Sequence, residues 1–197
     1  MLEVVGGSSP EAARRLLGAT IRHTTPEGTV AVELTEVEAY GGRDDPASHA
    51  HRGPTPRNGT MFGPPGRLYV YFSYGVHWCC NVVTGEEGDA SAGLLRAGRV
   101  VEGLDLARLR RGERVPEVGL ARGPGCLGQA LGLSREHDGA DLAGAGPLVL
   151  TPGPPVDGDR VRSGPRVGVR LAHEVPWRFW VADDPTVSRY QRNPRAV

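Results

Sequence analysis

The chain has 197 residues and 23 side chains of each charge sign, so its formal net charge is zero. This length suits one domain that buries its core without disulfide or metal staples, and no stretch of about 18 uncharged apolar residues predicts a membrane span. Three cysteines, two of them adjacent, and the lack of a C-x-x-C pair predict neither a disulfide framework nor a zinc site. Because the first 15 residues also lack the order of a secretory signal, we expect a reduced protein of the cytoplasm.

All 23 basic residues are arginine, because the sequence contains no lysine. Codon bias in a GC-rich genome is the simple explanation. The chemical consequence is that no side-chain amine can form a Schiff base, which leaves only the N-terminal amine for such chemistry. The zero net charge at first argues against a nucleic-acid partner, but net charge does not describe how charges are distributed.

The N-terminal half begins with a helix signal. Ser9-Pro10-Glu11 has the order of an N-cap, a first-turn proline and an early acid, which predicts a helix to about Leu17. The alternation of β-branched and polar residues over Thr29–Tyr40 predicts a strand. Residues 41–66 are rich in glycine and proline and predict a long loop, of a length that is usually functional or disordered.

The most aromatic part of the chain follows this loop. Arg67–Val83 alternates like a strand and is interrupted at Ser73-Tyr74-Gly75, which predicts two antiparallel strands joined near Tyr74 and Gly75. A further strand is predicted at Ala92–Arg96.

The remaining elements complete the predicted fold class. Two helices are predicted at Glu102–Arg111 and Gly125–Leu133, and three strands at Leu148–Leu150, Val167–Leu171 and Arg178–Val181. Strands and helices without a βαβ rhythm indicate an α+β domain around a mainly antiparallel sheet.

A carboxylate and an arginine stand out as candidate chemistry. In an extended strand Glu36, Glu38 and Tyr40 share one face, and Glu38 lies where that strand meets the long loop. Arg96 closes an apolar strand, and a buried guanidinium needs an acidic partner. Glu38 is a candidate partner, and the pair would keep its carboxylate ionised and able to act as a base. A solvated strand edge for Glu38, or a purely structural ion pair, remains the alternative.

The aromatic hairpin supplies a second feature. Tyr69 and Tyr71 point to one face, whereas Tyr74 lies at the predicted tip, where it could insert into a base stack or pack on a neighbouring loop. His49-Ala50-His51 could offer two metal ligands, but no third ligand stands at a familiar spacing, so we predict no metal site.

Several segments, in order along most of the chain, form a recognisable set. They are TEVEAY (Thr35–Tyr40), Ala47-Ser48-His49, TPRNGTMF (Thr55–Phe62), LYVYFSYGVHWCCNV (Leu68–Val82), LLRAGRVVEG (Leu94–Gly103) and GPGCLGQALGL (Gly123–Leu133), with weaker matches in RVGVR (Arg166–Arg170) and PWRFW (Pro176–Trp180). Together they resemble the alkyladenine (3-methyladenine) DNA glycosylase family. Two departures are a loop at residues 83–91 that is about two residues longer than in vertebrate members, and His77 in place of another aromatic.

The resemblance implies a fold and a set of roles. The fold is one α+β domain over residues 1–197, with a curved antiparallel sheet flanked by helices and a protruding hairpin. Glu38 would activate the attacking water, and Arg96 would help to hold that site. The remaining roles are a sandwich for the extruded base (Tyr40, His49, Tyr71), a side chain that fills the gap in the duplex (Tyr74), and a pocket residue that rejects guanine (Asn81).

The implied substrate is double-stranded DNA that contains damaged purines. Arg52, Arg57 and Arg67 are expected to contact phosphates, and the protein is expected to act as a monomer, without a cofactor, in association with the nucleoid. No second carboxylate clearly serves as a general acid, so alkylated purines, which leave as cations, are expected to be better substrates than hypoxanthine or ethenoadenine.

Two alternatives belong to other classes. One is a non-catalytic nucleic-acid-binding module of related fold, against which the presence of both Glu38 and Arg96 argues. The other is a metal-dependent hydrolase that uses His49, His51 and Glu38. Base release from damaged DNA, and activity in EDTA, distinguish these readings.

Overall fold

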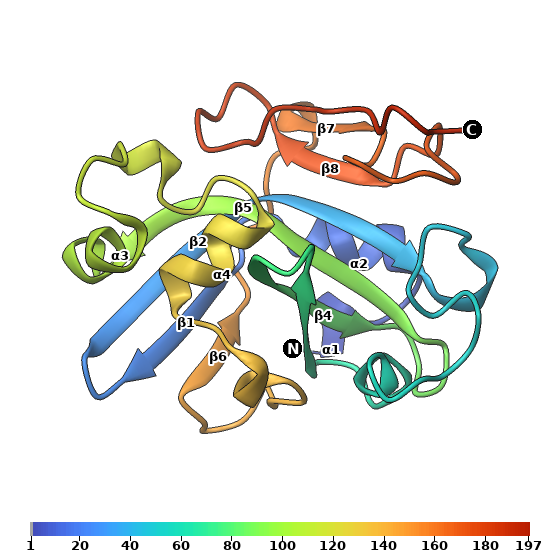
Figure 1. The fold of residues 1–197 in the computed structure, drawn as a ribbon, viewed down its shortest axis with the longest axis horizontal. Helices are drawn as coiled ribbons and strands as arrows, with labels where there is room; N and C mark the ends of the chain where they lie inside the picture. Colours follow the sequence, from blue (N-terminus) through green and yellow to red (C-terminus); the bar gives the residue numbers. More distant parts are fainter. Residues whose placement is uncertain (1) are drawn as a thin grey trace.

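The computed structural model describes residues 2–197, and these form a twisted sheet with helices on both faces (Figure 1). Every strand pairing in it is antiparallel. The strands run in the order β3-β4-β5-β2-β1-β6, and β8 pairs with both β2 and β7. Their bounds are β1 Thr20–Thr25, β2 Gly28–Gly41, β3 Leu68–Ser73, β4 His77–Thr84, β5 Ser91–Glu102, β6 Leu148–Thr151, β7 Val161–Gly164 and β8 Arg178–Val181. The predicted α+β class is confirmed.

Four α-helices pack on this sheet within the described part of the chain: α1 (Leu2–Val5), α2 (Ser9–Arg15), α3 (Leu104–Arg111) and α4 (Pro124–Leu131). In Figure 1, α4 lies in front of the sheet, and α1 and α2 lie behind it. Within residues 2–197, no helix is long and apolar enough to cross a bilayer.

The start of α2 shows how local sequence sets a boundary. Glu11 accepts hydrogen bonds from the backbone N–H of Ser8 (3.1 Å) and from its hydroxyl (2.8 Å), which satisfies the helix start as a capping box does. The helix ends at Arg15, two residues before the predicted Leu17, and the chain then turns at Gly18, whose φ of 78° suits glycine.

The hairpin and all but one of the predicted strands are present, and the structure differs from the prediction in three ways. The strand predicted at Ala92–Arg96 extends to Glu102, and β1 and β7 were not predicted. The strand predicted at Val167–Leu171 was wrong, because this segment is irregular. Its backbone N–H groups bond elsewhere: that of Val167 donates to the Glu38 carboxylate, and that of Gly168 to the carbonyl of Gln191.

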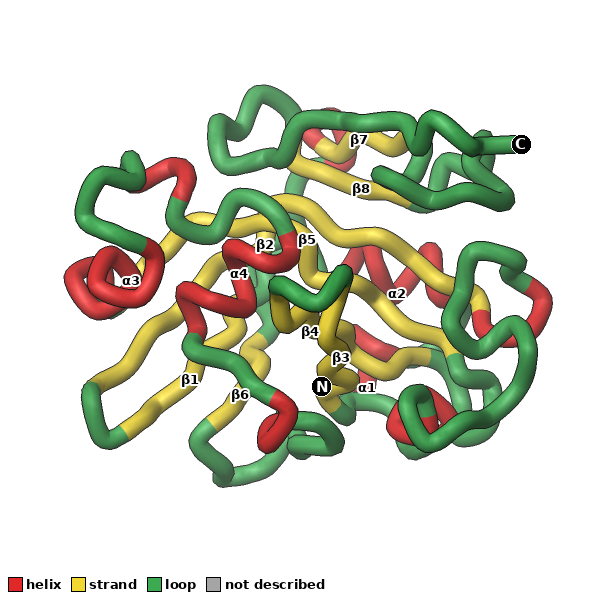
Figure 2. Tube along the Cα trace, in the orientation of Figure 1, coloured by secondary structure: helices red, strands yellow, loops and turns green. Residues whose placement is uncertain are grey.

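The long strands β2 and β5 carry irregularities at the centre of the molecule. The register passes from Leu34↔Gly98 to Glu36↔Ala97 and then to Val37↔Leu95, so Thr35 and Arg96 have no partner in this pairing. Such bulges re-aim side chains and are frequent beside active sites. Figure 2 shows both strands crossing the molecule, with the β7–β8 pair and the C-terminal segment on one side and the β3–β4 hairpin on the other.

Candidate active site

The floor of the site is a row of four side chains across four strands. Glu38 on β2 pairs with Leu94 on β5, Leu94 pairs with Asn81 on β4, and Asn81 pairs with Tyr69 on β3. Residues that pair directly across a sheet point to the same face. The sheet therefore brings together residues that lie more than 50 positions apart in the chain.

Glu38 is fully buried and has three polar neighbours. Its Oε2 accepts a hydrogen bond from the Tyr40 hydroxyl (3.0 Å), and its Oε1 accepts one from the Val167 N–H (2.7 Å) and lies 3.5 Å from Nε of Arg96. Burial raises the pKa of the Glu38 carboxyl above its ordinary value, while Arg96, Val167 and Tyr40 act in the opposite direction. A carboxylate with a raised pKa is a better proton acceptor than an exposed one.

Arg96 is buried and has two acidic partners rather than the one expected. Its Nε donates to Oε1 of Glu36 at 3.1 Å, which is closer than Glu38 at 3.5 Å. Glu36 also accepts hydrogen bonds from Nε of Arg178 (2.5 Å) and from the backbone N–H (2.7 Å) and hydroxyl (3.0 Å) of Ser188. The guanidinium of Arg96 therefore bridges the carboxylates of Glu36 and Glu38.

Above this floor, aromatic rings form one wall of the site. The rings of Tyr69 and Tyr71 are stacked, 5.6 Å apart, and His49 meets Tyr71 edge-on at 4.7 Å. Nδ1 of His49 lies 3.1 Å from the Tyr69 hydroxyl. Burial, together with Arg57, lowers the pKa of His49, so its ring is neutral at pH 7.

The same burial keeps the phenols protonated. It raises the pKa of Tyr69 to about 12, and it raises the pKa of Tyr40 and of Tyr71 well above the ordinary value. These uncharged rings can stack on a planar ligand, including a cationic one.

The tip of the β3–β4 hairpin projects from the molecule. Tyr74 is 91% exposed and has a φ of 51°, and Gly75 follows with a φ of 68°. The N–H of Val76 donates to the carbonyl of Ser73 at 3.0 Å, which closes a turn with two left-handed residues. A bulky residue in this conformation is uncommon, and its ring is presented to solvent rather than to the core.

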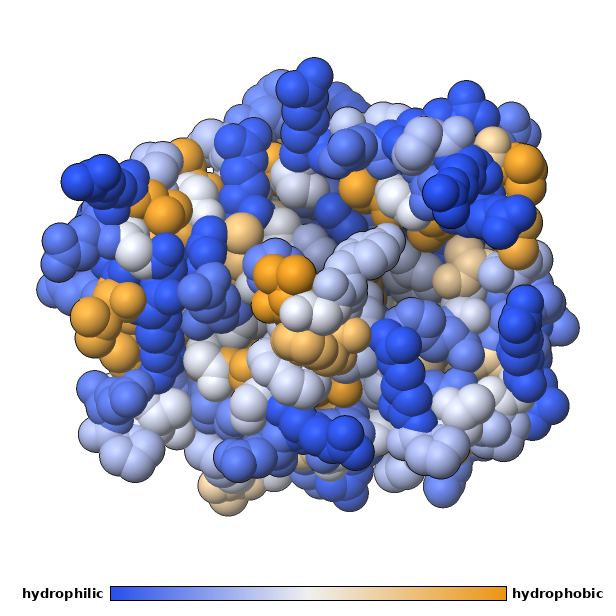
Figure 3. Space-filling view, viewed as in Figure 1, coloured by the Kyte–Doolittle hydropathy of each residue, from blue (hydrophilic) through white to orange (hydrophobic). Residues whose placement is uncertain are grey.

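A cavity of about 1000 Å³ connects these features. Its lining contains five arginines and, among residues 2–197, no aspartate or glutamate, although the chain has equal numbers of both charges. Figure 3 shows this face hollowed beside the projecting hairpin, with hydrophilic side chains around it. The arginines are Arg52, Arg57, Arg96, Arg170 and Arg192. Positive charge is therefore concentrated at this opening.

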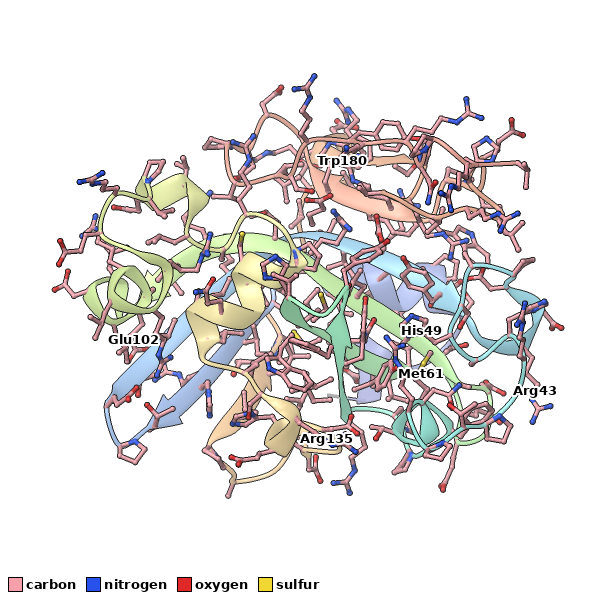
Figure 4. All side chains as sticks on the ribbon, viewed as in Figure 1. Arg43, His49, Met61, Glu102, Arg135 and Trp180 are labelled. Carbon is pink, nitrogen blue, oxygen red and sulfur yellow. The ribbon has the colours of Figure 1, made fainter. Side chains whose placement is uncertain are left out.

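The structure brings most of the predicted site residues to this cavity. The lining includes Tyr40, His49, Arg52, Arg57, Tyr71, Tyr74, Asn81 and Arg96. Glu38 is in contact with two of them, Tyr40 and Arg96. In Figure 4, His49 and Met61 lie on the same side of the hairpin, whereas Arg43 points outward from the neighbouring loop.

Two residues considered in the sequence analysis, Arg67 and His51, do not line the cavity. Arg67 precedes β3 at the end opposite the hairpin turn, where it donates to the carbonyl of Gly139 (3.4 Å) and lies 3.6 Å from Asp141. His51 turns away from His49, with its Nδ1 2.7 Å from the carbonyl of Arg43. No group of three or more His, Cys, Asp or Glu side chains able to hold a metal ion occurs in the described residues.

Sequence reasoning missed the contribution of the C-terminal segment. Residues 167–171 and 191–194 line the cavity, and Ser188 holds Glu36. The side-chain amide of Asn193 donates to the carbonyl of Gly168 (2.8 Å), which ties the two stretches together. These contacts run through backbone groups in irregular segments, for which a sequence pattern gives no periodic signal.

This α+β fold and site define a protein with an aromatic, arginine-lined cavity beside a buried carboxylate. A family model described as Methylpurine-DNA glycosylase (MPG) matches residues 3–185. The chain is 57% identical over 195 residues to a Frankia casuarinae protein, with 93% of this chain and 90% of that protein covered. It is 53% identical to relatives from Streptomyces avermitilis (184 residues; 92% and 86% covered) and Nocardia farcinica (193 residues; 95% and 89%).

All three relatives carry the name "Putative 3-methyladenine DNA glycosylase". The chain belongs to the methylpurine-DNA glycosylase family of DNA repair proteins.

Proposed function

We propose that this protein is a monofunctional DNA glycosylase, formed by one domain over residues 1–197, that removes alkylated purines from double-stranded DNA and leaves an abasic site. The observation that carries the proposal is the buried Glu38 carboxylate, which contacts three residues that line an aromatic, arginine-rich cavity. A base-binding module without catalysis has no use for such a carboxylate.

The first step is extrusion of the damaged nucleotide. A base in the stack hides its C1′ atom, and rotating it out costs a few kcal/mol of unstacking. Tyr74, 91% exposed at the hairpin tip, would occupy the vacated space, and the aromatic rings of the cavity would restore about 1–3 kcal/mol of stacking. Damaged or mispaired bases are less costly to extract, which contributes to selectivity.

The extruded base would stack on Tyr71 and His49, with Tyr40 opposite. His49 meets Tyr71 edge-on at 4.7 Å, too close for a base to enter between them, so these two rings would form one side of the sandwich. Asn81 donates to the carbonyl of Tyr69 through its amide nitrogen (3.2 Å), which fixes this side chain at the cavity, where it would reject guanine by crowding the exocyclic amine.

Cleavage follows from the position of Glu38. A water molecule attacks C1′ and transfers a proton to the carboxylate, while the bond from C1′ to the base breaks and its electron pair leaves with the base. The carboxylate also stabilises the oxocarbenium-like sugar. A 3-methyl or 7-methyl purine is cationic and becomes neutral as it departs, so it requires no general acid. Water would approach Glu38 where Tyr40, Arg96 and Val167 line the cavity.

Phosphate contacts complete the proposed complex. Arg52 and Arg57 lie on the loop side of the cavity, and Arg170 and Arg192 lie on the C-terminal side. A flipped nucleotide would thus have cationic side chains on both sides of its backbone. Arg67 remains a predicted contact at a greater distance from the opening.

The experiment is an excision assay on duplexes that each carry one lesion. We expect abasic sites to form fastest with 3-methyladenine and 7-methylguanine, and more slowly with hypoxanthine or ethenoadenine. Strands should break only after alkali, since the chain has no lysine for lyase chemistry. Glu38→Gln protein, purified by the same procedure, controls for contaminating glycosylases. Loss of activity in EDTA would favour a metal-dependent hydrolase instead, and binding without base release would favour a non-catalytic module.

A further inference from the structure

Arg166 is a fully buried arginine behind the wall of the cavity, and the proposed reaction does not use it directly. Its side chain has no exposed surface, and its partner Asp45 has only 1% exposed. Nη1 and Nη2 donate to the two carboxylate oxygens of Asp45, at 2.5 and 2.9 Å, in a bidentate pair. Replacing a buried pair of this kind by apolar residues is often neutral or stabilising, so stability alone does not explain it.

The guanidinium of Arg166 holds the ring of Tyr40 from behind. It lies 4.7 Å from the centre of the Tyr40 ring and 5.3 Å from that of Trp177, so it is stacked against both rings. Nη1 also donates to the carbonyl of Ala39 at 2.9 Å, next to Tyr40 in β2. Arg166 therefore restricts both the backbone next to Tyr40 and the Tyr40 ring.

The partner carboxylate extends this restraint to the loop that carries His49. Asp45 accepts hydrogen bonds from the backbone N–H of Gly41 (3.1 Å) and of Ala47 (3.0 Å). These two contacts fix the turn between the end of β2 and the loop wall, where Pro46 and Ala47 line the cavity.

Val167, the residue after Arg166, contacts Glu38, the proposed general base. Because Arg166 is anchored, the following peptide N–H, that of Val167, is held 2.7 Å from Oε1 of Glu38. One buried side chain thus fixes the orientation of Tyr40 and the donor to Glu38. A displacement of about 1 Å in such groups can lower a rate by about 10²-fold.

We infer that Arg166 is a positioning residue that pre-orients Tyr40 and the Val167 N–H, so that the extruded base is stacked and Glu38 is aligned in one arrangement. This inference rests on the proposed function. It predicts that loss of Arg166 impairs the stacking of the extruded base and the rate of excision more than the affinity for DNA.

The main test is the pair variant Arg166→Met with Asp45→Asn, which leaves no unpaired buried charge. Excision of 7-methylguanine under single-turnover conditions, with enzyme in excess, is expected to fall at least about tenfold, with less than threefold change in Kd for the duplex. Fluorescence of ethenoadenine in a duplex reports its stacking in the cavity without requiring excision. We expect the pair variant to lose most of the quenching seen with the wild-type protein.

A second variant covers the case in which the pair variant does not fold. Arg166→Lys keeps a positive charge beside Asp45 but cannot form the bidentate, stacked contact. We expect it to lose quenching as the pair variant does. Adding Tyr40→Ala to either variant should reduce quenching no further than Tyr40→Ala alone, because Arg166 acts on the base through that ring.

A matched control is Arg110→Met. Arg110 bonds the carbonyl of Ala130 and the side chains of Thr25 and Glu27 and does not line the cavity, so its loss should lower the melting temperature without changing quenching. Wild-type quenching and rates in folded Arg166 variants would overturn the inference and leave the proposed function intact. A wild-type protein that excises no lesion would instead refute the proposed function, while the fluorescence comparison would still decide the role of Arg166.

Discussion

Glu36 and Glu38 lie two residues apart on β2, and neither has exposed surface. Both contact the guanidinium of Arg96, but their other partners differ. Glu36 is saturated by a second arginine, Arg178, and by two donors from Ser188. Apart from Arg96, Glu38 has only the neutral donors Tyr40 and Val167, and all three of these neighbours line the cavity.

The difference shows how one residue type can have two roles on one strand. The positive charges of Arg96 and Arg178 balance the charge of Glu36. Glu36 therefore helps to connect β2, β5 and the C-terminal segment. Incomplete compensation leaves the pKa of Glu38 raised by burial, next to the aromatic cavity. The following predictions separate these roles.

Glu38→Gln should have the largest effect on the reaction. The amide keeps the shape of the side chain but cannot accept a proton, so single-turnover excision should fall about 10³-fold, within the range for general bases. Affinity for lesion-containing DNA should stay near that of the wild type in a gel-shift titration. Near-normal cleavage would remove Glu38 from its proposed role.

Glu36→Gln should mainly affect stability. It leaves Arg96 and Arg178 without their shared carboxylate, and breaking a buried pair costs about 3–5 kcal/mol. For a chain of this size we expect a melting temperature lower by about 6–20 °C in calorimetry. Glu33→Gln is the control, since that side chain is 40% exposed and lies 3.9 Å from Arg99. A larger loss of activity than with Glu38→Gln would reverse the two assignments.

The pH dependence of excision should report the carboxyl of Glu38. The base acts when ionised, and burial raises its pKa, so the rate should fall with decreasing pH through a value above the ordinary 4.5. Arg96 lowers this pKa, so Arg96→Gln should move the acid limb to higher pH. Single-turnover rates between pH 4.5 and 8.5 measure the shift, and an unmoved limb would separate Arg96 from the titrating group.

Tyr74→Ala should weaken extrusion while leaving the carboxylates unchanged. The lost stacking is about 1–3 kcal/mol, which corresponds to roughly 5- to 150-fold in the flipping equilibrium. Fluorescence of 2-aminopurine placed beside the lesion measures it. Val76→Ala, in the same turn and 65% exposed, should give the wild-type signal. Equal signals from Tyr74→Ala and wild type would argue against insertion of this side chain.

The smallest effect concerns the arginines. Arg52→Gln should reduce the slope of log K against log salt by about one, because Arg52 lines the cavity where phosphates would pass. Arg67→Gln should reduce the slope less, since Arg67 lies near Asp141 at the other end of β3. An equal reduction by both variants would extend the DNA contact along that strand.

The sequence by itself determined much of the local structure. The alternation over Thr29–Tyr40, the break at Tyr74 and Gly75, and the apolar run before Arg96 predicted the three strand regions that carry the site. Periodicity is a local property, and it can be read wherever a strand has one polar and one apolar face. The same patterns singled out Glu38, Arg96 and Tyr74 because each is an exception to its surroundings.

Only the tertiary structure decided which partners these residues have. Arg96 was expected to pair with Glu38, but the bulges in β2 and β5 also bring it to Glu36. Val167 was expected in a strand, yet its N–H serves Glu38, and Arg166 is buried beside Tyr40. These contacts join segments 60 or more residues apart, in part through backbone groups and irregular turns. Because they depend on how the whole chain closes around its core, no pattern within a single segment specifies them.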